Sequence, residues 1–170
     1  MTPPTFSRFI LTKKAVPYFN GDNCHGDDFH YTSLKRMQEA ISFWLWSYEN
    51  GYFVRWSIID KDADEVVGTI ELFRHEDKVA VYDNCGLLRL DLRSDYEKRD
   101  VIAEILSLII APSYDMFGDK TITKVKYFAF ERLAAVKALG FVLPKEGFKL
   151  QNEEECRDYY VAKLTETYKI

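Results

Sequence analysis

The sequence predicts a single α+β domain over residues 1–170, with helices flanking a mixed, mostly antiparallel sheet of about six to seven strands. Three runs alternate between apolar and polar residues, at 52–60, 65–73 and 87–92, as half-buried strands do. Two amphipathic runs with helical spacing follow the third strand and are separated by another strand. With 170 residues, 47% of them hydrophobic, the chain is long enough to bury a core.

The first half of the chain is expected to hold an edge strand, a loop, a helix and a hairpin. The edge strand is "RFILTKKAV" (8–16), and the Gly-, Asp- and Asn-rich stretch 17–32 is the loop. Thr32 or Ser33 caps the helix, and Gly51 closes it. The turn "DKDAD" then joins the first two alternating runs into a hairpin. The apolar stripe of the helix is Met37, Ala40, Ile41 and Trp44.

The second half of the chain is expected to form strand, helix, strand, helix and a closing hairpin. The long helix after the strand 87–92 should end at Pro112, because proline cannot continue a helix. The short helix in "ERLAAVKALGF" should stop at Gly140. The stripe of the long helix is Ile102, Ile105, Leu106 and Ile109. The remaining strands are 121–128, 147–149 and 156–164, the last two pairing with each other.

Composition and charge exclude several classes of function. A formal net charge of -4 offers no basic face for nucleic acid. No segment reaches the roughly 20 apolar residues that cross a bilayer, and the start of the chain lacks the layout of a signal peptide. The three cysteines lie far apart and are odd in number, which favours reduced thiols. We therefore expect a cytoplasmic protein that binds neither nucleic acid nor membrane; the sequence does not define its oligomeric state.

Two clusters invite a ligand-binding interpretation. The segment "CHGDDFH" (24–30) gathers potential metal ligands, but zinc sites usually show paired ligands at two recurrent spacings and this cluster stands alone. No metal site is therefore expected. A dense aromatic group is expected to lie mostly in the core rather than to stack on a ligand. Its members are Trp44, Trp46, Tyr48, Tyr52 and Trp56.

The element order, together with "EVVGTIELF", "LLRLDLRSDYEKRDVIAEIL" and "VKALGF", resembles the GNAT acetyltransferase superfamily from about residue 8 to residue 164. In that family a turn of the form Arg/Gln-x-x-Gly-x-Gly/Ala opens the long helix and holds the pyrophosphate of acetyl-CoA. Orphan amides at a helix start suit such an anion. The corresponding stretch here is 97–102, whose three signature positions, Glu97, Asp100 and Ile102, all depart from the pattern. The resemblance still implies acetyl-CoA as cosubstrate.

The resemblance implies that acetyl-CoA contacts the central strand through its main chain and the start of the long helix. Lys98 and Arg99 could act as charged donors that compensate for the acidic turn, or could simply be solvated. The segment "SDYE" (94–97) also has the form of a capping box, in which Ser94 and Glu97 would satisfy the helix amides themselves. The implied contact residues are Leu90, Leu92, Lys98, Arg99, Asp100, Val101 and Ile102.

The candidate catalytic residues are Asp91 and Glu71. Many members of the family place a carboxylate on the third or fourth strand to take a proton from the acceptor amine. Both residues alternate with apolar neighbours and so face away from the leucine stripe of the strand, where a partly dry cleft can raise a carboxylate pKa. The alternative is an ordinary surface carboxylate, or one paired with an arginine. Many family members also carry a tyrosine on the fourth helix as general acid, and one branch carries an asparagine and a serine there. The corresponding positions here are Val136, Ala129 and Arg132, and none of them matches. The tyrosines that could substitute as the general acid are Tyr127, Tyr159 and Tyr160.

Two functions remain open on these residues. The first is an N-acetyltransferase that transfers an acetyl group to a primary amine of a small molecule or peptide. The second is a non-catalytic GNAT-fold binding or regulatory protein that has lost its affinity for acetyl-CoA. The turn at 97–102 separates them. The resemblance also implies a V-shaped opening between the strands 87–92 and 121–128, and a closed gap there would count against both ligand-binding interpretations.

Overall fold

The computed structural model describes residues 32–75, 81–149 and 155–163, and the structural statements below concern these residues. In chain order the elements are α2 Leu34–Glu49, β1 Phe53–Asp60, β2 Glu65–His75, β3 Cys85–Leu92, the 3₁₀ turn η1 Ser94–Tyr96, α3 Arg99–Phe117, β4 Lys120–Lys124, α4 Phe130–Ala138, β5 Phe148–Lys149, β6 Glu155–Cys156 and β7 Tyr159–Lys163.

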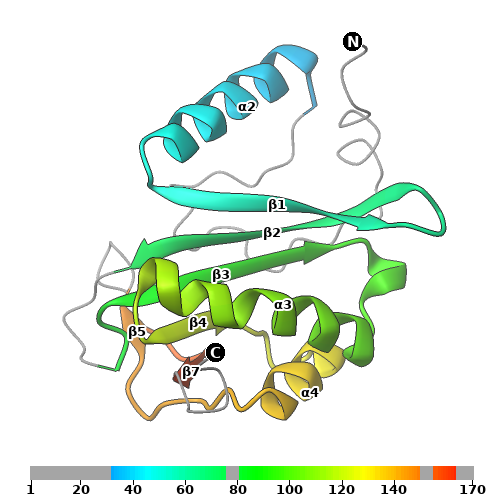
Figure 1. Cartoon of the computed structure of the whole chain (residues 1–170). Helices are drawn as coiled ribbons and strands as arrows, with labels where there is room; N and C mark the ends of the chain where they lie inside the picture. Colours follow the sequence, from blue (N-terminus) through cyan, green and yellow to red (C-terminus); the bar gives the residue numbers. More distant parts are fainter. Residues whose placement is uncertain (1–31, 76–80, 150–154, 164–170) are drawn as a thin grey trace.

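The main sheet has the strand order β1-β2-β3-β4-β7, in which only the β3–β4 pair is parallel (Figure 1). The α+β class and the mostly antiparallel sheet are thus confirmed. Within the described part of the chain the main sheet has five strands rather than six or seven, because β5 and β6 form a separate two-stranded ribbon. The expected edge strand 8–16 and the segment 24–30 lie outside the described residues.

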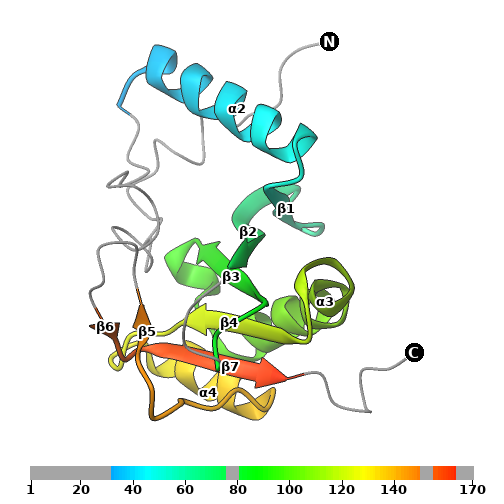
Figure 2. The ribbon, with the colours of Figure 1, turned by 90° about the vertical axis from the view of Figure 1, so that its left-hand side faces the viewer.

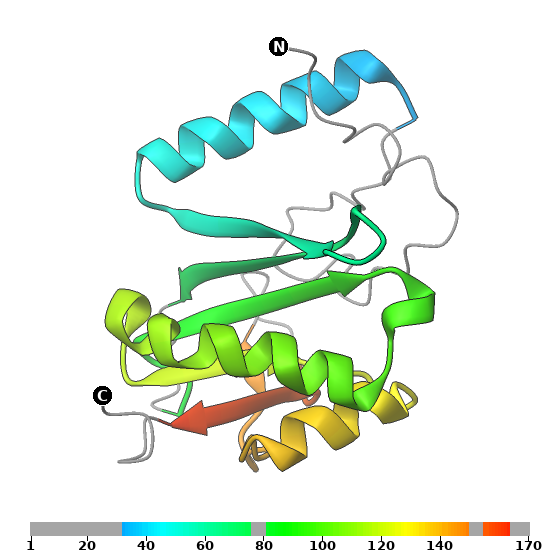
Figure 3. The same cartoon turned by 45° about the vertical axis from the view of Figure 1, so that its right-hand side comes forward.

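The helices lie on different parts of the sheet. Figures 1 and 3 show α3 lying along the central strands with α4 beside it. Figure 2 shows α2 next to β1, at the end of the sheet opposite β7. The region between β3, β4, α3 and α4 is therefore bounded on several sides by regular structure.

The two faces of β3 have different roles. Leu88, Leu90 and Leu92 are buried with Ile102 and Leu106 of α3 in the larger core. Leu87 lies in a second apolar cluster on the other face, together with Tyr82, Ile122, Phe148, Tyr159 and Val161. Because side chains alternate along a strand, the residues at 89 and 91 face the same side as Leu87, away from α3.

Helix boundaries agree with the prediction where local capping decides them. The Ser33 side chain accepts a hydrogen bond from the Arg36 amide at 3.2 Å and caps α2. Gly51 and Gly140 follow α2 and α4 with φ of 71° and 81°, the left-handed conformation that favours glycine after a helix.

Pro112 does not end α3, contrary to the prediction. The helix continues to Phe117, and Gly118 ends it with φ of 124°. Proline removes one hydrogen bond of the helix ladder, but Tyr114 and Phe117 beyond it are both buried in the core. Burial of these two rings therefore outweighs the local cost of the proline.

Two predicted strands and the aromatic group also need correction. β4 ends at Lys124 rather than at 128, and the segment 156–164 is divided between β6 and β7, with β6 pairing with β5 as expected for 147–149. Of the five aromatic residues expected mostly in the core, Trp44 and Trp56 pack against apolar clusters. The exposed ones are Trp46, Tyr48 and Tyr52, at 51%, 59% and 60%.

Candidate active site

A gap between β3 and β4 is the central feature of the site. The two strands pair only as far as Leu88 and Thr123. The chain beyond β4 then turns towards β7, with the Val125 amide donating to the Asp158 carbonyl at 2.8 Å. The β4-facing edge of β3 therefore lacks a strand partner around Leu90, and unpaired strand edges are places where other groups can bind.

Arg132 of α4 occupies this gap. Its Nη1 donates to the Leu90 carbonyl at 2.6 Å, its Nε donates to Glu97 Oε2 at 2.9 Å, and its Nη2 contacts Glu97 Oε1. The Arg132 and Glu97 side chains are only 4% and 11% exposed. The cavity left between β3, β4, α3 and α4 has a volume of about 10 Å³, close to the least that holds one water molecule.

The role of Arg132 was not predicted, although a sequence signal for it existed. Arg132 shares the buried face of α4 with Ala135 and Val136. A charged residue on an otherwise apolar helix face requires a buried partner. The identity of that partner, Glu97, lies 35 positions away in the sequence and depends on the tertiary fold.

At the start of α3, two backbone amides have an acceptor and two have none. The Arg99 amide donates to Glu131 Oε2 at 2.7 Å. The Ile102 amide donates to the Lys98 carbonyl at 2.9 Å, which begins the helix ladder. In the part of the chain that the structure describes, the amides of Asp100 and Val101 have no acceptor. These two amides, at the positive end of the helix, are suited to an anion.

The predicted capping box does not form. Lys98, not Ser94, is the residue at the helix start, and it makes no side-chain cap. Ser94 belongs to the separate turn η1, which also lacks a side-chain cap. Glu97 turns to the buried guanidinium of Arg132 instead of to a backbone amide, because an ion pair with buried Arg132 satisfies both charges.

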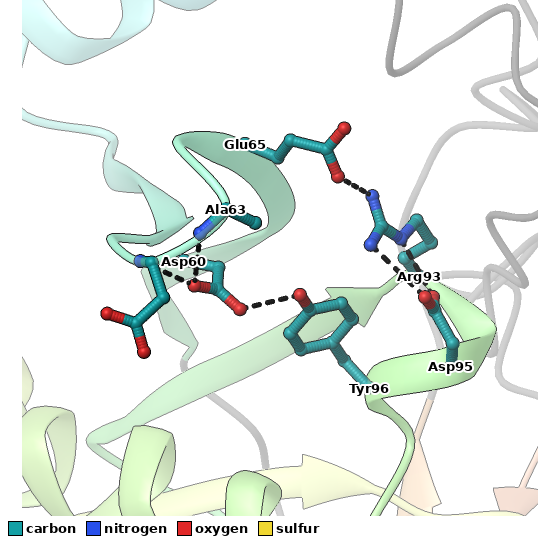
Figure 4. A network of polar contacts seen from close by, with 7 residues as sticks. Asp60, Ala63, Glu65, Arg93, Asp95 and Tyr96 are labelled. Atoms are coloured by element: carbon teal, nitrogen blue, oxygen red, sulfur yellow. Dashed lines mark hydrogen bonds and ion pairs between the residues drawn. The ribbon is translucent and has the colours of Figure 1, made fainter.

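Figure 4 shows the polar network that fixes the connection between β3 and α3. Arg93 donates to Asp95 and to Glu65, each at 2.7 Å, and the Tyr96 hydroxyl donates to Asp60 at 2.6 Å. Asp60 also accepts two backbone amides of the β1–β2 turn. The Tyr96 hydroxyl is the largest cause that lowers the pKa of Asp60 below its usual value. Contacts with the hairpin, rather than a cap, thus position the turn that leads into α3.

Glu71 lies in an arginine-rich cluster on the sheet face away from α3. Its Oε2 accepts from Arg55 Nε at 2.9 Å and its Oε1 accepts from Arg89 Nη1 at 3.1 Å. The Arg55 guanidinium also lies 3.9 Å from the ring centroid of Trp44 in α2. Arginines therefore bind both carboxylate oxygens of Glu71. This residue is thus a carboxylate paired with arginine, the alternative to a catalytic base.

Asp91 lies near Glu71 on the same face but has a different environment. Its Oδ1 is buried and has no hydrogen-bond partner in the described part of the chain, although the residue as a whole is partly exposed. Burial raises the pKa of Asp91 to about 6, and the charge of Glu71 adds to this rise. Arg132 is the strongest influence in the opposite direction. Of the two predicted bases, only Asp91 thus combines a free oxygen with a pKa near neutrality.

The other polar residues near the site are placed as follows. Tyr127 is 82% exposed, while Tyr159 and Tyr160 are buried, and burial raises the pKa of Tyr160. Burial and the neighbouring Lys126 lower the pKa of Lys124, at the end of β4, to about 8. Sequence reasoning did not identify Lys124, since a lysine at a strand end is usually solvated.

Of the residues predicted to contact acetyl-CoA, Leu90 and Ile102 line the cavity in the gap, and the others lie along β3 and the start of α3. Lys98 and Arg99 are exposed, and the Asp100 side chain is 95% exposed, so these charges point towards solvent. Ile102 is 1% exposed and belongs to the core, so its branched side chain does not cover the free amides. The donors at the helix start therefore suit a diphosphate group, although Glu131 and Arg132 lie where such a ligand would approach.

The described residues contain no cluster of side chains that could hold a metal ion. Across the same ranges, no helix is both long and apolar enough to span a bilayer.

Comparisons with known proteins identify the fold. No family model and no curated protein sequence matches the chain. Among solved structures, a ribosomal-protein-S5-alanine acetyltransferase from Vibrio fischeri aligns with a TM-score of 0.60 at 12% identity, over 81% of this chain and 75% of that one. A spermidine N-acetyltransferase from Vibrio cholerae gives a TM-score of 0.56 at 11% identity, over 78% and 75% of the two chains.

A third similar structure contains the expected cosubstrate. The N-acetyltransferase PseH from Campylobacter jejuni, in complex with acetyl coenzyme A, aligns with a TM-score of 0.52 at 12% identity, over 79% of this chain and 83% of that one. At such low identities the likeness concerns the arrangement of the backbone, and it agrees with the element order that first suggested the resemblance. The chain therefore has the backbone fold that these acetyltransferases share.

Proposed function

We propose that this protein is an N-acetyltransferase that transfers an acetyl group from acetyl-CoA to a primary amine of a small molecule or peptide. The single observation that carries the proposal is Asp91, a carboxylate with one buried unpartnered oxygen and a pKa of about 6. Further support comes from similar structures named for a ribosomal-protein alanine and for spermidine. A net charge of -4 is compatible with a cationic acceptor.

Asp91 is the general base in this proposal. At pH 7 a carboxyl group with a pKa of about 6 is mostly ionised, so it can accept a proton from the acceptor ammonium and leave a nucleophilic amine. Glu71, held by Arg55 and Arg89, contributes through its charge, which helps to raise the pKa of Asp91. Glu71 is therefore a positioning residue and Asp91 the catalytic one.

The main chain at Leu90 and Leu92 and the helix start from Lys98 to Ile102 would hold acetyl-CoA, which supplies the acetyl group as a thioester when bound. The two free amides, of Asp100 and Val101, would carry the diphosphate. The proposal also includes a single domain over 1–170 and a cytoplasmic location; the location is supported by Cys85 and Cys156, which form no disulfide within the described residues.

One observation favours the second function, a non-catalytic GNAT-fold binding protein. Arg132 fills the strand gap and Glu131 occupies the first amide of α3. If these contacts are permanent, acetyl-CoA has no site, and the chain retains the fold without the activity.

A transfer assay tests the proposal. The protein is incubated with acetyl-CoA and with spermidine, an alanyl-terminated peptide or a seryl-terminated peptide, and both thiol release and product mass are followed. We expect transfer to at least one amine and a decrease in kcat of roughly 10²–10⁴-fold in Asp91→Asn, the range for a lost general base. Asp115→Asn, which changes an exposed carboxylate of α3, is the matched control. Absence of transfer to every amine would favour the binding protein, and full activity of Asp91→Asn would remove the base.

A further inference from the structure

Side chains of the chain itself occupy the gap between β3 and β4 and the first amide of α3, where the proposed function places acyl-CoA. We propose that Glu97, Glu131 and Arg132 form an internal latch, which keeps the groove closed and must open before acyl-CoA binds. The inference rests on the proposed function, since it concerns the same groove. In this proposal three side chains, and not only the lack of glycine in the turn 97–102, control the access of the ligand.

The first part of the latch is the Glu97–Arg132 pair. The guanidinium uses Nε and Nη2 on Glu97 and Nη1 on the Leu90 carbonyl, so it bridges the strand edge and the turn before α3. A ligand that pairs with the edge of β3 has to displace Nη1 from Leu90. Arg132 is only 4% exposed, and the adjacent cavity of about 10 Å³ holds at most about one water molecule.

The second part of the latch is Glu131 on the first amide of α3. Its Oε2 accepts from the Arg99 amide at 2.7 Å, which is the kind of contact a phosphate oxygen makes at a helix start. The carboxylate thus takes one of three exposed amide positions and places a negative charge where an anion would bind. Because this contact is exposed to solvent, it can exchange with a ligand, unlike the buried pair.

The two parts are linked through the first turn of α4. Glu131 and Arg132 are adjacent in sequence, so one movement of this turn withdraws both side chains. This turn lacks a side-chain cap at its N-cap Ala129, and the neighbouring Phe130 is 74% exposed, while Ala129 itself is buried in the larger core.

A closed majority state lowers the apparent affinity for a ligand. If only the open fraction binds, the apparent Kd equals the intrinsic Kd divided by that fraction. Substitutions that remove latch contacts without altering the binding amides should therefore tighten binding. Glu131→Ala removes the exposed contact. Glu97→Gln with Arg132→Ala removes the buried pair together, so that no unpaired buried charge remains.

The test measures binding by calorimetry with three probes: coenzyme A, inorganic pyrophosphate and pantetheine. Glu131→Ala should bind pyrophosphate and coenzyme A about threefold to tenfold more tightly than the natural sequence, as expected for loss of one competing hydrogen bond. The double variant should bind pantetheine and coenzyme A on the order of tenfold more tightly. Glu104→Ala, which removes an exposed carboxylate of α3 outside the latch, is the charge-matched control and should bind like the natural sequence.

Hydrogen exchange gives a readout that does not depend on ligand. The Arg99 amide should exchange faster in Glu131→Ala than in Glu104→Ala, because its acceptor is gone. Circular dichroism and urea unfolding confirm that each variant is folded. If the double variant does not fold, Glu131→Ala with pyrophosphate decides the proposal.

The outcomes separate the latch from the proposed function. Equal affinities in the natural sequence and the folded variants refute the latch, and an active enzyme among them leaves the transferase proposal intact. Tighter binding by the variants without acetyl transfer supports the latch and refutes the transferase. Absence of coenzyme A binding in every folded variant refutes both.

Discussion

Replacing Asp91 with asparagine removes a carboxylate whose ionisation is unfavourable in the folded protein. Its pKa is raised from 3.8 to about 6, mainly by burial. The folded state thus binds more protons than the unfolded state between these two values, so this group lowers stability as the pH rises through that window. At about 1.36 kcal/mol for each tenfold change in the ionisation constant, this difference between the folded and unfolded pKa of Asp91 corresponds to a penalty of about 3 kcal/mol once both states are ionised.

Asp91→Asn should therefore be more stable than the natural sequence at pH 8, by up to about 3 kcal/mol, and nearly equal to it at pH 4. At the same time the variant should lose acetyl transfer, because asparagine cannot accept the proton. Urea unfolding at the two pH values measures the free energies. Asp115→Asn, at an exposed site, controls for the change in net charge.

A gain in stability that is equal at pH 4 and pH 8 would refute the reasoning, since only a titrating group produces the difference. A loss of stability at pH 8 would show that the amide leaves a buried donor unsatisfied at a greater cost than the charge. Either result would also weaken the assignment of Asp91 as the base, because the same buried environment supports both conclusions.

Three further predictions concern the base and two positions of the fold. In the active enzyme, kcat at saturating acceptor should rise as the pH increases through about 6, because Asp91 accepts a proton only when ionised; a flat profile from pH 5 to 8 would exclude it as the base. Gly118→Ala should lower the free energy of unfolding by about 1–3 kcal/mol, since φ is 124° and the new Cβ would collide with the Asn84 carbonyl; unchanged urea unfolding would contradict this. Tyr96→Phe should raise the pKa of Asp60 towards its usual value, as followed by NMR of the carboxyl carbon, because the tyrosine hydroxyl is the largest cause of its depression; an unaltered titration would show that the hydrogen bond does not form in solution.

The parts of the fold that depend on neighbouring residues were predictable from the sequence. The hairpin of β1 and β2 and the stripe of α3 follow from periods of two and 3.6 residues, and both are observed. The same alternation placed Asp91 and Glu71 on the face away from the leucines, where the structure has them. The caps at Ser33 and Gly140 rest on local chemistry as well.

The errors occur where a distant partner competes with a local preference. The pattern "SDYE" favours a capping box, but Glu97 pairs with Arg132, which α4 brings within reach. Pro112 favours a helix end, but the burial of Tyr114 and Phe117 extends the helix. In both cases the local interaction contributes about 1–3 kcal/mol, and a buried contact outweighs it.

The sequence by itself therefore determined the class of the fold, the order of its elements and the orientation of the candidate base, because these are set by periodicity and by side chains a few positions apart. Only the tertiary structure decided which side chains occupy the gap between β3 and β4 and the start of α3. It places Arg132 against Leu90 and Glu131 against Arg99, which lie 42 and 32 positions apart in the chain. No local pattern encodes such contacts, since they form only when α4 folds against the start of α3, and they decide whether the amides and the strand edge are available to a ligand.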